Sequence, residues 1–161
     1  MVFAFALVGA RAVAVCAATA PCADCAHVAA IVDTLPGTFR QVVSGKFHED
    51  ITDHDRTGCM LVISGSWREL GNRPGPADLI RDVLGREGWR EGIASSDGPD
   101  GTSYVMVRGE SICLVRGRWD GGDDSDTTIV PIDVYQVIVF CSSLLADDRR
   151  RLEEEKRKQS D

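Results

Sequence analysis

Apolar residues recur along the chain with two different spacings, and each spacing is typical of a different kind of element. Spacings of three and four residues over 24–35 and again over 77–84 predict two amphipathic helices. Pro36 and Gly37 end the first helix, and Pro76 precedes the second at a first-turn position where proline is tolerated. Their apolar stripes are Val28, Ile31, Val32 and Leu35, and Leu79, Ile80, Val83 and Leu84.

Most of the remaining apolar residues fall in short runs that predict β-strands. The most continuous run, Cys59 to Ile63, predicts a central strand over 58–67 with both faces covered. Gly109 and Glu110 separate the runs 103–108 and 111–119, as expected for a tight hairpin. Further extended segments are expected at 39–43 (or there an extension of the first helix), at 91–96, at the polar edge segment 47–55, and at 134–141.

This order of elements predicts an α+β fold, with a mostly antiparallel sheet of four to five strands and two helices packed on one face. The 161 residues accommodate one domain, expected over 21–143, followed by a charged helical or disordered tail over 144–161. The tail after Ala146 contains acidic and basic residues in equal number, so the net charge of −7 belongs to the domain. An acidic domain disfavours nucleic acid and anionic membranes as partners, and leaves cations and basic protein surfaces open.

The amino-terminal residues 1–20 resemble a secretory signal peptide. An apolar middle precedes Ala18, Thr19 and Ala20, which fit the small residues of a cleavage site. The run is too short and interrupted for a stable membrane span, which needs about 20 apolar residues. No basic residue lies at the start, so the true start codon is open, as are a buried first strand, a membrane anchor and lipid attachment at Cys16. We expect export to the periplasm or the medium, or a lipid-anchored form.

Cleavage after Ala20 would leave five of the six cysteines, and an exported protein favours disulfides between them. Cys113 and Cys141 have matching strand parity, so neighbouring antiparallel strands would bring them together. Cys59 would then pair with Cys22 or Cys25. The alternative is a cytosolic protein with buried free cysteines.

Three sequence segments suggest chemistry, each beside a simpler interpretation. Cys22 and Cys25 form a C-x-x-C that a thiol–disulfide oxidoreductase would use, although no βαβ unit precedes it. The second is the polar edge segment 47–55. If it is extended, side chains two residues apart share one face, and that face could bind zinc or copper or simply be a solvated edge. The residues of that face are His48, Asp50, Thr52 and His54.

The third segment follows the strand that ends at Trp119. It contains four carboxylates, which favour calcium in principle, but their spacing is not that of an EF-hand. We therefore expect a solvated connection, with calcium as the alternative and no other cofactor. The carboxylates are Asp120, Asp123, Asp124 and Asp126.

The sequence contains no G-x-S-x-G, phosphate-binding glycine loop or H-E-x-x-H motif. We therefore expect a non-catalytic, disulfide-stabilised module that binds another protein, as an inhibitor or an envelope adaptor does. Trp67, Trp89 and Trp119 end predicted elements and would serve either as core residues or as binding anchors. The alternative is an enzyme, either a C-x-x-C oxidoreductase or a metal-dependent hydrolase.

Overall fold

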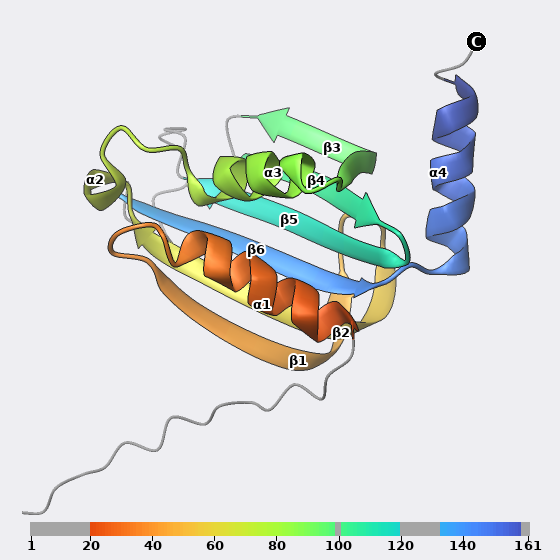
Figure 1. Ribbon diagram of the computed structural model, residues 1–161, viewed down its shortest axis with the longest axis horizontal. Helices are drawn as coiled ribbons and strands as arrows, with labels where there is room; N and C mark the ends of the chain where they lie inside the picture. Colours follow the sequence, from red (N-terminus) through yellow and green to blue (C-terminus); the bar gives the residue numbers. More distant parts are fainter. Residues whose placement is uncertain (1–19, 99–100, 120–132, 159–161) are drawn as a thin grey trace, which may run out of the picture.

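A computed structural model describes residues 20–98, 101–119 and 133–158 as an α+β structure (Figure 1). The helices are α1 (Ala20–Val32), α2 (Trp67–Leu70), α3 (Pro76–Arg86) and α4 (Ala146–Lys158). The strands are β1 (Phe39–Glu49), β2 (His54–Ser66), β3 (Arg90–Gly98), β4 (Gly101–Arg108), β5 (Ser111–Trp119) and β6 (Val134–Ser143). They form one sheet in the order β1-β2-β6-β5-β4-β3, and every neighbouring pair is antiparallel.

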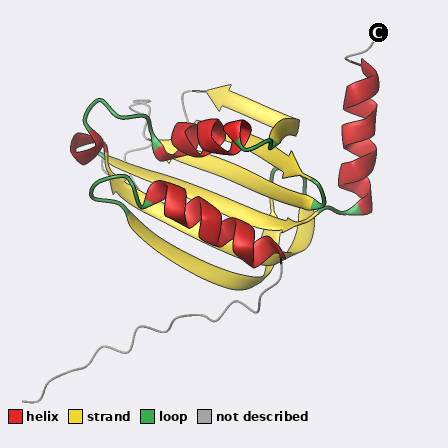
Figure 2. Cartoon of the chain, in the orientation of Figure 1, coloured by secondary structure: helices red, strands yellow, loops and turns green. Residues whose placement is uncertain are grey.

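Helices α1 and α3 lie on one face of this sheet, as the sequence predicted (Figures 1 and 2). Val28 and Val32 of α1 are completely buried, and so are Ile80 and Leu84 of α3. Pro76 occupies the start of α3, where its missing N–H leaves no helical bond unmade. The apolar stripes read from the sequence are therefore the surfaces that the two helices bury.

The sheet contains six strands rather than the four to five expected, and the segments 39–43 and 47–55 were divided incorrectly. They form a single strand, β1, and a hairpin into β2 whose turn lies at residues 50–53. Asp53 adopts a left-handed φ of 58° in this turn, a conformation that aspartate tolerates better than most residues. His48 consequently pairs with Asp55 across the hairpin, and the expected face of His48, Asp50, Thr52 and His54 does not form.

Two other expectations differ from the structure. On the helix-covered face of β2, Cys59, Leu61 and Ile63 are completely buried, whereas Met60 and Val62 on the opposite face are only half-buried. The helix count also differs, because the short α2 follows β2, whereas the helix α4 in the tail is one of the two alternatives expected there. The hairpin at Gly109 agrees with the prediction, and its positive φ of 59° explains the glycine.

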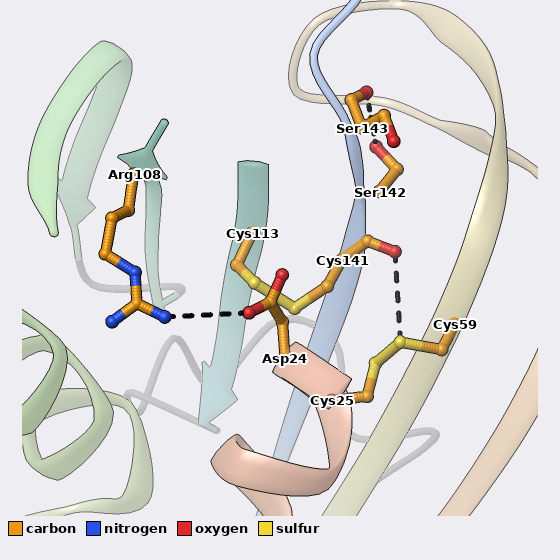
Figure 3. The surroundings of a disulfide bond; sticks show 8 residues. All are labelled: Asp24, Cys25, Cys59, Arg108, Cys113, Cys141, Ser142 and Ser143. Carbon is orange, nitrogen blue, oxygen red and sulfur yellow. Dashed lines mark hydrogen bonds and ion pairs between the residues drawn. A yellow bond between two sulfur atoms is a disulfide. The ribbon is translucent and has the colours of Figure 1, made fainter. Parts of the chain in front are cut away.

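Two disulfides lie on the helix-covered face of the sheet (Figure 3). One joins two strands to each other, and the other joins a strand to α1. Cys113 of β5 is bonded to Cys141 of β6, the pair that strand parity predicted. Cys25 of α1 is bonded to Cys59 of β2, so Cys25 is the partner rather than Cys22. Cys59, Cys141 and Cys113 are direct register partners across β2, β6 and β5, and all are completely buried. One bridge therefore joins β5 to β6, and the other joins α1 to β2.

Replacing both Cys113 and Cys141 by serine should lower the free energy of unfolding by about 3–4 kcal/mol. On the chain-entropy model this is the unfolded-state freedom restored by opening a loop of this length. The bridged cysteines are separated by 28 residues. Urea unfolding of the oxidised wild type and the double variant measures the change. Peptide mapping without reduction should recover the two cysteines in one linked fragment, and free alkylation of both in unfolded, unreduced protein would contradict the bridge.

Candidate binding surface

The sheet face opposite α1 and α3, here called the open face, carries a second apolar cluster. Alternation along each strand sends one set of side chains to the helices and the other to this face. Leu114 and Phe140 are nearly buried at its centre, and Phe47 and Met60 are half-buried beside them. The remaining members of the cluster are Val105, Val107, Ile112, Leu144, Ile51 and Leu152.

A groove of about 160 Å³ runs along the open face beside the β1–β2 hairpin. Its apolar lining includes Ile138 together with Phe47 and Phe140, whose rings meet edge to face at 5.4 Å between centroids. Glu49, Asp50 and Arg116 provide polar groups at its margin, in addition to His48. An apolar floor with a few charged groups at the rim is the usual composition of a protein-binding site.

A more polar hollow of about 410 Å³ lies beyond Arg116 on the β3–β4–β5 side of the sheet. Ser96, Ser103 and Arg118 contribute its side chains, and Ser103 is the register partner of Arg116. Arg116 also reaches across to the hairpin turn, where its Nη1 lies 3.0 Å from Asp50 Oδ2. This arginine therefore separates the apolar groove from a hydroxyl-lined, basic region.

One end of the open face is closed by α4 through a buried ion pair between Arg56 and Asp148. Both side chains are completely buried, and two guanidinium nitrogens donate to the carboxylate at 2.7 and 2.6 Å. Arg56 also donates to Glu49 at 3.2 Å and to the hydroxyl of Thr52 at 2.7 Å. The guanidinium thus connects β1, the hairpin turn and α4 at one point.

The ion pair keeps both groups charged despite their burial. Burial opposes ionisation of Asp148, but hydrogen bonds from Arg56 and from the Leu145 backbone N–H outweigh it and lower the pKa of the carboxyl. Burial likewise opposes the charge of Arg56, and the hydrogen bond and charge of Asp148 more than compensate, so its pKa is raised. The stability that Asp148 contributes is therefore complete above its ordinary pKa of 3.8 and is lost as the pH falls below it.

The sequence analysis missed this cluster because it treated the polar hairpin and the charged tail as solvated. One local signal was present: Asp148 is the third residue of α4 and accepts a hydrogen bond from the N–H of Leu145, just before the helix begins. This is half of a capping box, whose usual serine or threonine is replaced by leucine. Sequence alone did not show that the same carboxylate would also bind Arg56.

The histidines proposed as metal ligands lie on opposite faces of the β1–β2 hairpin and have different partners. His48 is exposed and hydrogen-bonded to Asp55 at 3.1 Å, and this bond, aided by the charges of Asp55, Asp53 and Asp50, raises the pKa of the imidazole. His54 donates from Nδ1 to the carbonyl of Thr52. Within the described part of the chain, no three histidine, cysteine, aspartate or glutamate side chains form a group suited to a metal ion.

The tryptophans proposed as binding anchors have different environments. Trp89 is only 3 % exposed and lies under the guanidinium of Arg108, at 4.8 Å, so it belongs to the core. Trp67 is half-buried and packs edge to face on Tyr135, with 5.2 Å between ring centroids. The side chain of Trp119 lies outside the described residues. So do the proposed signal peptide as far as residue 19, including Cys16, and the proposed calcium ligands Asp120, Asp123, Asp124 and Asp126.

Comparisons with protein-family models, with curated proteins and with solved structures find no match to this chain. Over residues 20–98, 101–119 and 133–158, no helix is both long and apolar enough to cross a membrane.

Asp148→Asn should lower the free energy of unfolding by about 3 kcal/mol, because it removes the charged partner of the buried Arg56 guanidinium. Asp147→Asn is the matched control. Asp147 is the preceding residue and pairs only with partly exposed Arg150, Arg151 and His54, so its loss should cost less than about 1 kcal/mol. Chemical denaturation of both variants at neutral pH makes the comparison. Equal effects of the two substitutions would contradict the role assigned to the buried pair.

The difference in stability between wild type and Asp148→Asn should also depend on pH. It should be constant above the ordinary aspartate pKa of 3.8 and should shrink as the pH falls below that value, because Asp148 then becomes protonated in the wild type. Thermal unfolding across an acidic pH series measures this difference. A difference that stays the same down to strongly acidic pH would show that the charge of Asp148 is not what stabilises the fold.

Proposed function

We propose that this protein is a non-catalytic binding module that uses the open face of its sheet to bind another protein. The observation that carries the proposal is the apolar groove on the open face, which is lined by Phe47, Met60, Ile138 and Phe140. Phe140 is buried and the other three side chains are half-buried, so the groove offers a partly accessible apolar surface, and apolar grooves with a polar rim often mark an interaction site. The charged residues around the groove would form the polar rim of such an interface.

The module is proposed to act outside the cytoplasm. Two disulfides support this placement, because bridges of this kind persist in oxidising compartments and are rare in the cytosol. The amino-terminal sequence, with its apolar run and its small residues at 18–20, supports export independently. An inhibitor or an envelope adaptor would need the same combination of a rigid scaffold and one apolar contact face.

The oxidoreductase alternative has less support than the sequence suggested. A dithiol motif works by forming and breaking a bond between its own two cysteines. Cys25 is instead bonded to Cys59, is completely buried, and fixes α1 to the sheet. Its position is that of a structural bridge.

Ile138→Glu should weaken binding of the partner at least about tenfold, because it places a charge on the apolar floor of the groove. The control is Leu79→Glu, the same change at a half-buried position on α3, on the opposite side of the sheet. The partner would be identified by crosslinking to the wild-type protein in the extracytoplasmic fraction of the native host. Binding would then be measured between purified components, using variants whose melting temperatures show that they are folded.

If Leu79→Glu weakens binding as much as Ile138→Glu, the open face is not the binding surface. If no extracytoplasmic protein binds in purified form, the proposed function is wrong.

A further inference from the structure

The two edge strands of the sheet are built differently. β3, at one edge, has an irregular register with β4 between Glu91 and Ser95, and α4 packs against it. Leu152 of α4 lies so close to Gly92 of β3 that a Cβ there would be only 3.0 Å from its methyl group. A bulged strand packed against a helix is a poor template for further strands.

β1, at the other edge, has none of these protections. It pairs with β2 over its whole length of 11 residues without a register shift, and it contains no proline. Within the described residues, no strand pairs with its outer side. In an antiparallel edge strand, alternate residues direct their N–H and C=O groups away from the sheet, so the outer side of β1 presents a regular row of hydrogen-bonding groups.

The two faces of β1 carry different sets of large side chains. On the open face it carries Phe39, Val43 and Phe47, and Phe39 is 76 % exposed, the highest exposure of any large apolar side chain in the described residues. On the helix-covered face it carries Arg40 and Lys46, in a protein whose net charge is −7. Three apolar side chains on one face and two basic side chains on the other therefore flank the same unpaired edge.

The basic groups of β1 have partners that can be exchanged. Arg40 contacts Asp33 at 2.6 Å, and Lys46 lies 3.6 Å from Asp55, with its side chain 71 % exposed. Exposed pairs of this kind contribute at most about 1 kcal/mol, so an incoming carboxylate can replace the present one at little cost.

From these features we propose that β1 accepts an extended strand of the partner protein as a seventh strand of the sheet, and that this strand alternates acidic with apolar residues. The inference rests on the proposed function and specifies the chemistry of the partner. Side chains directly opposite each other on paired strands lie about 4.5–5.5 Å apart at Cβ, which places partner carboxylates against Arg40 and Lys46. The alternate side chains then extend the apolar surface from Phe39 and Val43 to the groove.

A second copy of this chain is a poorer occupant of the edge. Two β1 strands paired antiparallel about Val43 would place Arg40 of each copy opposite Lys46 of the other. Like charges directly opposite each other destabilise a strand pair. The charges of β1 therefore favour an acidic strand over self-association.

The test uses the full-length oxidised protein and a short blocked peptide that alternates glutamate with valine. Binding measured by fluorescence anisotropy should be at least about tenfold tighter than that of the same peptide with lysine in place of glutamate, which converts two attractive cross-strand pairs into repulsive ones. Two further peptides carry N-methyl groups on alternate residues, one set on each edge. One of them should lose binding, because backbone bonds hold an added strand.

Lys46→Glu should remove the preference for the glutamate peptide. Arg118→Glu is the matched control, because it makes the same charge change at an exposed position on β5, three strands away from β1. It should leave the preference unchanged. Both variants replace exposed side chains, so thermal melting should show that they are folded.

Several results would overturn the strand-addition proposal. These are equal binding of the glutamate and lysine peptides, binding that survives both N-methylated versions, or equal effects of Lys46→Glu and Arg118→Glu. A peptide-free dimer that Lys46→Glu dissociates would also overturn it, since the occupant would then be a second copy. Loss of partner binding in Ile138→Glu but not in Lys46→Glu would reject β1 as the docking edge while leaving the open face as the binding surface.

Discussion

The row of three cysteines across β2, β6 and β5 is the constraint on which the rest of the structure depends. Cys59, Cys141 and Cys113 are register partners on adjacent strands, and their side chains lie beneath α1. Because a one-residue slip would turn a strand's side chains to the other face, bonding Cys113 to Cys141 fixes the register of β5 against β6. The second bridge, from Cys59 to Cys25, then decides which face of the sheet α1 covers. Within residues 20–98, 101–119 and 133–158, α4 is the helix that packs against the open face, at one end of it.

The position of α4 is decided by electrostatics rather than by apolar packing. Only its Leu152 is apolar apart from Ala146, so burial of a hydrophobic stripe cannot anchor it. A charge buried as deeply as that of Arg56 is stable only with a close counter-charge, and Asp148 provides it from the first turn of α4. The helix is therefore held at one end of the open face, where it completes the second core and leaves the groove accessible.

Sequence patterns correctly predicted the features that are determined by residues close together in the sequence or by strand parity. The helical stripes, the hairpin at Gly109 and the Cys113–Cys141 pair follow from spacing, turn chemistry and strand parity. The patterns failed in the polar segment 47–55, where the chain turns from β1 into β2. This segment lacks the alternating apolar residues that would show where one strand ends and the next begins. They failed again at Arg56 and Asp148, because 92 positions separate them in sequence and each belongs to a charged segment of ordinary appearance. The groove was not predictable for the same reason, since its lining comes from β1, β2, β5 and β6.

Charge and backbone have separate roles at the β1 edge. Replacing the exposed contacts of Arg40 and Lys46 by contacts with a partner is close to neutral in free energy, because one surface pair is exchanged for another. Net affinity must then come from backbone hydrogen bonds along β1 and from apolar contacts at Phe39 and Val43. The two basic residues act against wrong partners instead, since a strand with lysine at the same positions places like charges opposite Arg40 and Lys46. An acidic protein with two exchangeable cations at one edge can in this way select an acidic strand without losing much stability in the unbound state.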